Sequence, residues 1–377
     1  MAACGLEHSL LITEQGEILS GGSNEYGQLG SSVIPPMSST RRCFMAMIPE
    51  LTDVFAVACG MYHSVCLDTF GIVRTFGRNH KGQLGLGEGA KAVTPTVVPG
   101  LDNITAIACG YHFTLCLKDN DSLWGFGDNG KMQLTEINDT KVVFSPVIVV
   151  AGMDIDKIDA GAHFSVIITH SGSVYCAGCC RGFFRLRGFV NVFSKVTDIP
   201  EIREISCTSA CLYMISDEGL IYELGHSCLS EEQTLFVRSG LCRINIDKRF
   251  ISISCGYNHV IALDQDNTLL SFGWNHSGQL GCGWGSTDRI TYPTIKKFVF
   301  PHCRYMYENL TDISCISSGG YHCFAQTSSG VHHWGNNSKG QLGSGTRKRS
   351  YHPQLTYLPK LKTNLMPHWS RVKSARK

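Results

Sequence analysis

Histidine, glutamine and asparagine recur at fixed intervals along this chain, and such side chains could bind a metal ion or support acid–base catalysis. The histidines end a step in which a small residue and a glycine precede two variable positions, as in Cys4 to His8 and Cys59 to His63. Glutamine and asparagine belong to a second signature, Asn-x-x-Gly-Gln-Leu-Gly, found near Asn24, Asn79, Asn275 and Asn336. A side chain that every copy carries serves a need that every copy has. We therefore expect structural roles: the asparagines bond local backbone groups, and the histidines and glutamines link neighbouring units.

Cysteine is a second candidate for chemistry, with 18 residues in the chain. Many occupy one repeat position that suits a small, buried, apolar side chain: Cys4, Cys59, Cys109, Cys207 and Cys255. Cys176 and Cys179 form an isolated C-x-x-C without a second pair, so we expect no zinc, redox chemistry or cofactor. No signal peptide or transmembrane stretch is recognisable, which predicts a reducing compartment, cytoplasmic or nuclear.

The two signatures alternate with a period of about fifty residues and return seven times. Short apolar runs around them, bounded by turn residues, predict four short antiparallel strands in each unit. Such a unit buries its apolar faces only against its neighbours. The pattern predicts an all-β fold, a seven-bladed β-propeller of four-stranded antiparallel blades, as one domain over residues 1–377. We place the repeats at approximately 1–51, 52–101, 102–152, 153–199, 200–247, 248–309 and 310–362.

Three copies depart from the histidine step. Phe113 and Phe164 fill the histidine position in the third and fourth copies, and Cys211 fills it in the fifth, the weakest copy. The spacing still holds at roughly fifty residues around that copy, so it is counted as a blade.

The first unit starts directly at Met1-Ala2-Ala3-Cys4 and is expected to lack the strand that precedes Cys-Gly elsewhere. Residues 363–377 include Trp369 to Ala375, which is similar to that strand in the second unit. This basic segment is therefore expected to supply the closing strand of blade one, and removal of the chain from about residue 365 should destabilise the ring.

Together these signatures resemble the repeats of the regulator of chromosome condensation family, over essentially the whole chain. The resemblance implies a seven-bladed propeller. Its founding member is a guanine-nucleotide exchange factor for the GTPase Ran, and other members bind unrelated partners. Function therefore does not follow from the fold.

The two variable positions of the histidine step should form a ring around one mouth of the propeller. Tyrosine, histidine and asparagine with little charge are typical of protein-binding surfaces. Alternatively, these side chains simply plug the channel. The expected partner-binding residues of the ring are Glu7, Tyr62, Tyr111, His112, His163, Tyr257, Asn258 and Tyr321. The resemblance implies acidic residues at these positions in the Ran exchange factor, whereas Glu7 is the only acidic residue at the ring positions of this chain.

The fourth unit lacks the Gln-Leu-Gly turn and instead contains an irregular segment with Arg181, Arg185 and Arg187. The exchange factor that this family resemblance implies uses a protruding hairpin as a wedge, and this segment could play that part. It could equally be a decayed blade edge. Long segments after Ser31 and after Cys282 are further places where function could lie.

The net charge of +2 is unevenly distributed. After Asp312 the chain holds ten basic and no acidic residues, whereas the remainder has 23 basic against 31 acidic residues, a charge of −8. The basic end is either a solvated surface or a site for weak electrostatic binding. Aromatic residues are not interleaved with it, so sequence-specific nucleic-acid binding is not expected.

Two functions are consistent with these observations. The first is a protein-interaction propeller, an adaptor or scaffold, with a small GTPase or another regulatory protein as partner. The second is a guanine-nucleotide exchange factor. We expect a monomer. The sequence contains no nucleophile elbow or phosphate loop, so we expect no hydrolase or transferase chemistry.

Overall fold

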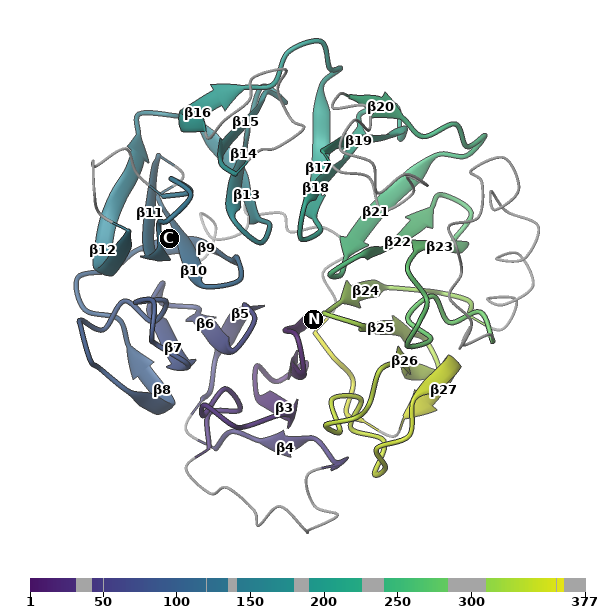
Figure 1. Ribbon diagram of the computed structural model, residues 1–377. Coiled ribbons are helices and arrows are strands. Elements are labelled where there is room, and N and C mark those ends of the chain that lie inside the picture. Colours follow the sequence, from purple (N-terminus) through teal and green to yellow (C-terminus); the bar gives the residue numbers. More distant parts are fainter. Residues whose placement is uncertain are drawn as a thin grey trace, which may run out of the picture.

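Each repeat folds as an antiparallel meander, and the seven resulting sheets stand around a central channel (Figure 1). The computed structural model describes residues 1–31, 43–49, 51–119, 121–134, 141–179, 190–225, 241–283, 310–356 and 358–362. The first strand of each blade lies next to the channel and the last lies outermost. The predicted seven-bladed all-β propeller is confirmed.

The strands follow the repeats closely. Blades one and two contain β1 (Ala2–Cys4), β2 (His8–Ile12), β3 (Ile18–Gly22), β4 (Ala46–Met47), β5 (Val54–Cys59), β6 (His63–Asp68), β7 (Val73–Gly77) and β8 (Ala92–Val97). Blades three and four contain β9 (Ile104–Cys109), β10 (Phe113–Lys118), β11 (Ser122–Asp128), β12 (Val142–Ala151), β13 (Ile155–Ala160), β14 (Phe164–Thr169), β15 (Val174–Gly178) and β16 (Val190–Lys195). Blade five contains β17 (Ile202–Cys207), β18 (Cys211–Ser216), β19 (Ile221–Gly225) and β20 (Cys242–Arg243). The described part of blade six contains β21 (Phe250–Cys255), β22 (His259–Asp264) and β23 (Leu269–Gly273), and blade seven contains β24 (Cys315–Ser318), β25 (His322–Thr327), β26 (Gly330–Gly335) and β27 (Ser350–Thr356).

The hydrophobic cores lie between adjacent blades. The second strand of a blade is covered on both faces, so β2 and β6 are buried along their whole length. Leu10 and Ile12 of β2, for example, pack in one cluster with Val57 and Phe76 of blade two. Such strands appear in sequence as continuous apolar runs rather than as an alternating pattern.

The expectation that blade one lacks its first strand is wrong. Blade one does have a first strand, because β1 pairs with β2 through Ala2, Ala3 and Cys4. Leu361 then forms an antiparallel bridge with Thr13, and Lys362 N donates to Ile12 O at 2.9 Å. Residues 360–362 and β1 thus lie in line beside β2, so both ends of the described chain build one strand position. The predicted closing segment, 363–377, lies outside the described residues.

The glycine of the histidine step is required by close packing. A Cβ on Gly60 would lie 2.0 Å from His63 Cε1 and 2.7 Å from the Gly110 carbonyl oxygen. The imidazole three residues later therefore occupies the space of the missing side chain. Phe113 fills the same space beside Gly110, which explains why phenylalanine can replace histidine there.

Blade five makes the opposite exchange. Thr208 stands at the glycine position, and Cys211, which has no ring, stands at the histidine position. The Thr208 hydroxyl donates to the Cys211 carbonyl oxygen at 3.2 Å. In this copy, the weakest in sequence, a larger residue at the glycine position is therefore compensated by a smaller residue at the histidine position.

The repeated histidines join neighbouring blades, as predicted. His8 Nε2 lies 3.0 Å from Ser64 Oγ, and Ser64 Oγ donates to the Gln28 carbonyl oxygen at 2.7 Å. Because the hydroxyl proton is used in this second bond, His8 must donate through Nε2–H. The same link, hereafter the latch, joins His63 to Thr114, His259 to Cys323 and His322 to Ser9.

The glutamines act differently from the expectation. The Gln83 side chain accepts from Lys81 N at 2.8 Å within its own turn, and only its backbone carbonyl oxygen bonds the next blade, through Thr114. Asn79 Oδ1 accepts from Leu84 N at 3.0 Å, the local role that was predicted. In the last copy Asn337, rather than Asn336, occupies this position and accepts from Leu342 N.

The first strands enclose a channel cavity of about 300 Å³. It is lined by the repeat-position cysteines Cys4, Cys59, Cys109, Cys207 and Cys255 and by Asp159. The described cysteines form no disulfide. Burial raises the pKa of Cys4 to about 12 and also raises the pKa values of Cys59, Cys109 and Cys207, so these four thiols are poor nucleophiles. No cluster of three potential metal ligands occurs among the described residues. Within the same residues, no helix has the length and apolar character needed to cross a bilayer.

Candidate functional site

One face of the propeller, called here the mouth face, carries the loops between the first and second strands and between the third and fourth strands of each blade. A belt of backbone bonds holds its inner loops in place. Met61 N donates to Tyr111 O at 3.1 Å, Tyr111 N to Ala162 O at 3.3 Å, and Ser209 N to Tyr257 O at 3.1 Å. The variable positions are therefore presented by a fixed frame around the channel.

Three tyrosines from separate blades meet over the channel. The rings of Tyr111 and Tyr257 stack with centroids 5.3 Å apart, and Tyr257 lies 5.6 Å from Tyr321. His163 adds an edge contact to Tyr111 at 5.8 Å. These side chains cover the channel mouth, yet each remains partly exposed. The side chains that cover the channel are thus the same ones that the sequence analysis expected to contact a partner.

The contacts continue outward on both sides. Tyr111 meets His112 at 6.5 Å, and His112 meets His80 at 5.0 Å. In the other direction His276 packs on Tyr321 at 4.7 Å and on Trp274 at 5.8 Å. Trp274 is 42% exposed. We call this row the aromatic band; it comprises Trp274, His276, Tyr321, Tyr257, Tyr111, His112 and His80.

The aromatic band is uncharged near neutral pH. Burial, followed by the neighbouring His80, lowers the pKa of His112 to about 4. Burial also lowers the pKa values of His80 and His276, with Arg78 and Arg349 respectively as the next cause. Burial raises the pKa of Tyr111, and Tyr257 adds to this effect. The band therefore offers rings and neutral polar atoms to a partner.

Tyr62 lies beside the band in a cluster of its own. Its ring contacts Tyr26 with centroids 5.3 Å apart, and the Arg78 guanidinium lies 4.6 Å from the Tyr26 centroid and 5.6 Å from that of Tyr62. Arginine over aromatic rings is held in place while its edge stays available for hydrogen bonds to a carboxylate.

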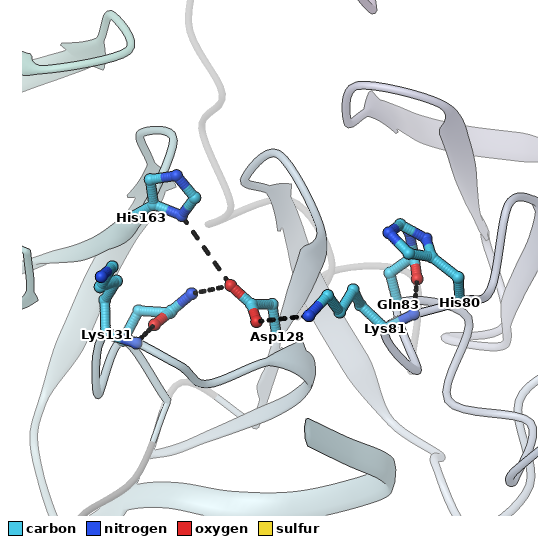
Figure 2. A network of polar contacts seen from close by, with 7 residues as sticks. His80, Lys81, Gln83, Asp128, Lys131 and His163 are labelled. Atoms are coloured by element: carbon cyan, nitrogen blue, oxygen red, sulfur yellow. Dashed lines mark hydrogen bonds and ion pairs between the residues drawn. The ribbon is translucent and has the colours of Figure 1, made fainter. Parts of the chain in front are cut away.

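Asp128 connects three blades at the mouth (Figure 2). Gln133 Nε2 donates to Asp128 Oδ2 at 3.1 Å, while Lys81 Nζ and His163 Nδ1 lie 3.9 Å from its two oxygens. Gln133 in turn accepts from Lys131 N at 2.9 Å. The Asp128 carboxylate thus accepts one hydrogen bond, from Gln133, and has one cation nearby, the Lys81 ammonium at 3.9 Å. Burial lowers the pKa of His163, so that ring stays neutral beside it.

The two faces of the propeller differ in charge. Described loops of the mouth face carry three acidic residues, Glu7, Glu25 and Glu88, against nine basic ones: Arg78, Lys81, Lys91, Lys131, Lys141, Lys339, Arg347, Lys348 and Arg349. The far face carries the loops between second and third strands and the links between blades. Its described loops hold four basic residues, Lys248, Arg249, Lys360 and Lys362, against fourteen acidic ones: Glu14, Glu17, Asp53, Asp102, Asp119, Asp121, Asp154, Asp198, Glu201, Asp217, Glu218, Asp247, Asp266 and Asp312.

The residues predicted from sequence are distributed as follows. Tyr111, His112, Tyr257 and Tyr321 belong to the aromatic band, and His163 contacts it. Asn258 instead accepts a bond from Ser209 at 3.2 Å, which ties blade five to blade six. Glu7 lies 4.0 Å from Lys339 of the neighbouring blade. The positions of Arg181, Arg185 and Arg187 lie outside the described residues.

Sequence reasoning missed Trp274, His276, His80 and Arg78. All four lie in or next to the Asn-x-x-Gly-Gln-Leu-Gly turns, at positions that vary between copies. The backbone of each turn is bonded to the histidine step of its own blade, as in Arg78 N to Tyr62 O at 2.9 Å and Trp274 N to Asn258 O at 2.9 Å. The variable positions of both signatures therefore share one face, and this was the signal that could have identified them.

The fold and the mouth face place the protein in a class: seven-bladed propellers that carry one aromatic surface around the channel, built from positions that vary between the repeats. Two descriptions of the Regulator of chromosome condensation (RCC1) repeat match the sequence, one at residues 15–67, 71–117 and 329–373 and the other at residues 104–133 and 250–279. Together they cover about half of the 377 residues. The chain belongs to the RCC1-repeat family.

Similar proteins extend over most of the chain. Protein RCC2 homolog of Danio rerio is 27% identical over 338 residues, 87% of this chain and 50% of that protein. Regulator of chromosome condensation of Mus musculus is 27% identical over 381 residues, 92% of this chain and 86% of that protein. The crystal structure of Prp20p from Saccharomyces cerevisiae has a TM-score of 0.74 at 15% identity, covering 92% and 87% of the two chains, and this likeness concerns the fold alone. The chain spans about half the length of the RCC2 relative.

Proposed function

We propose that this protein is an interaction propeller that binds a small GTPase or another regulatory protein through its mouth face. The aromatic band carries the proposal, because rings from several blades form one partly exposed, uncharged surface on a rigid frame. Aromatic side chains in such a setting supply much of the binding energy at protein interfaces. The repeated histidines, by contrast, are buried and bonded to the neighbouring blade.

The relatives support a protein partner. The Prp20p structure was described together with its binding properties to Gsp1p and histones. The family resemblance also implies Ran as the partner of the founding member. The described cysteines form no disulfide, which fits the cytoplasmic or nuclear setting that we propose.

Guanine-nucleotide exchange is the second candidate, favoured by the shared fold with a TM-score of 0.74 to Prp20p. An exchange factor would bind the nucleotide-free GTPase more tightly than the GDP form, and this difference in affinity would drive release. The cationic mouth of this chain differs from the acidic surface that the resemblance implies for Ran exchange. For this reason we favour the interaction propeller.

A panel of purified small GTPases, Ran included, tests both functions in one experiment. Each GTPase is loaded with fluorescent GDP and mixed with the protein, and both retention on the immobilised propeller and the rate of GDP release are measured. Retention without faster release is expected for the interaction propeller. Release accelerated by roughly tenfold or more would establish exchange, and neither retention nor release across the panel would remove small GTPases as the partner class.

A further inference from the structure

The aromatic band has a cationic group close to each end. Arg78 lies beside His80 and, with Lys81, contributes to the lowered pKa of that histidine. At the other end the Arg349 guanidinium donates to the His276 carbonyl oxygen at 3.4 Å, and Arg349 is exposed, as are Arg347 and Lys348. The middle of the band, where Tyr111 stacks on Tyr257, carries no charge. The mouth face thus presents a neutral, aromatic row between two positively charged ends.

Two acidic groups near this row, Asp128 and Glu7, lie close to basic or amide groups, whereas Glu25, next to Tyr26, is exposed. Asp128 is held by Gln133, Lys81 and His163, and Glu7 lies 4.0 Å from Lys339. The described loops of the mouth face therefore keep an excess of positive charge that their own carboxylates do not balance. A ligand with carboxylates would complement this excess.

We propose that the mouth face binds an acidic polypeptide segment laid along the aromatic band, with carboxylates at the Arg78 and Arg349 ends and apolar or aromatic residues over Tyr111 and Tyr257. The proposal rests on the proposed function and names the chemistry of its partner. The path from ring to ring along the band is about 33 Å long, so at most about ten extended residues are needed to follow it. Arginine is suited to the ends, since its guanidinium binds carboxylates with two parallel hydrogen bonds.

A single-stranded nucleic acid is the competing ligand, because it too is bound by aromatic rings and cations. Bases stack on open ring faces. Here the faces of Tyr111 and Tyr257 are turned to each other at an interplanar angle of 22°, so they are not free to accept a base. A polypeptide can pack against the ring edges, and Tyr111 and Tyr257 both remain partly exposed, which favours the acidic segment.

A random decapeptide display library, selected on the immobilised full-length protein, tests this inference. Enriched sequences should carry Asp or Glu toward both ends and apolar or aromatic residues between them. A synthetic peptide of the enriched sequence is then titrated against the parent and against Arg78→Glu with Arg349→Glu. We expect the double variant to bind at least about tenfold more weakly, and affinity for the parent to fall with added salt.

The matched control is Lys195→Glu with Arg243→Glu, which changes the net charge equally at two exposed residues of the outer strands β16 and β20. It should bind the peptide within about twofold of the parent. A peptide with lysine at the end facing residue 349 should regain affinity for the single variant Arg349→Glu. Because the Arg349 side chain is exposed, this single variant also replaces the double variant if Arg78→Glu fails to fold. Equal loss in the control pair, no rescue, or enrichment of neutral or basic peptides would overturn the proposal.

Further outcomes separate this inference from the proposed function. Peptide binding that is lost with Tyr62→Ala and Tyr257→Ala but unchanged by charge reversal would refute only the acidic segment. Peptide binding that is unaffected by the tyrosine changes would place the site elsewhere and refute the mouth face as well. Displacement of the peptide by a single-stranded oligonucleotide at equal concentration, or no enrichment at all, would also overturn the inference.

Discussion

The latches between blades and the aromatic band at the mouth use similar residues in opposite ways. In the latch, His63 is fully buried and bonded to Thr114 of the next blade, and four blades repeat this arrangement. In the band, His80 and His276 are exposed and their positions hold other residue types in other blades. The comparison teaches that a side chain repeated in the ring serves folding, while function is to be sought where the copies differ. Each prediction below changes one region and asks whether the other responds.

The largest expected effect is loss of stability in acid, which comes from the latches. Burial lowers the pKa of His8 to about 4 and those of His63, His259 and His322 to about 3, from an unfolded value of 6.5. Below pH 6.5 these histidines therefore bind protons in the unfolded chain but stay neutral in the folded chain. The free energy of unfolding is therefore highest above pH 6.5 and falls as the pH decreases toward 4 and then 3. Asp159 opposes this, because burial raises its pKa to about 6 and stability gains from its protonation.

Taken together, these five groups leave about three more protons on the unfolded chain near pH 5. The contribution of these five groups to the free energy of unfolding should then fall by about 4 kcal/mol for each pH unit, and His112 and His333, whose pKa values burial lowers to about 4, add to this fall. Urea unfolding followed by tryptophan fluorescence between pH 7.5 and 4.5 measures this slope. The control is His63→Phe, because blade three has phenylalanine at this position. This variant should lose little free energy of unfolding at pH 7.5, and the unfolded chain should bind about one proton fewer in excess of the folded chain, so the slope becomes smaller. An unchanged slope would mean that the latch histidines do not govern acid unfolding.

The next largest effect concerns the glycine beneath the latch. In Gly60→Ala the new Cβ would lie 2.0 Å from His63 Cε1, so the imidazole must leave its place and the link to Thr114 is lost. We expect a loss of about 3 kcal/mol or more in the free energy of unfolding. Gly89→Ala, where a Cβ would meet nothing within 4 Å, is the control for introducing a methyl group. That control has a positive φ of 72° and should cost only about 1 kcal/mol, from backbone strain. Similar losses in both variants would contradict the packing role of Gly60.

Much of the fold could be predicted because each repeat contains the turn signatures and apolar runs that define its own strands. The period gave seven blades, and Gly60 with His63 indicated contact between units. The pairing of His63 with Thr114 could not be derived, since it joins residues 51 positions apart across two blades. The strand β1 was missed because only three residues precede Cys4 and the register with β2 was needed to recognise them.

The candidate site was predicted in part. The histidine step placed Tyr111 and Tyr257 at the same mouth, but their stacking across the channel depends on ring closure and on side-chain direction. Trp274 and His276 were overlooked because they lie in a turn whose neighbouring residues are structural. Charge asymmetry between the two faces was also invisible in sequence, where acidic and basic loops alternate along the chain.

The most direct test of the central claim compares proteins captured from a cell extract by the parent, by Tyr62→Ala with Tyr257→Ala, and by the control pair Phe70→Ala with Ile148→Ala. Phe70 and Ile148 are 70% and 54% exposed and lie away from the mouth face. Melting temperatures of the three proteins should agree within a few degrees, because the mouth tyrosines lie outside the latches. The account predicts that proteins retained by the parent and by the control pair are lost with the mouth pair. Retention of the same proteins by all three, or loss of stability without loss of capture, would contradict it.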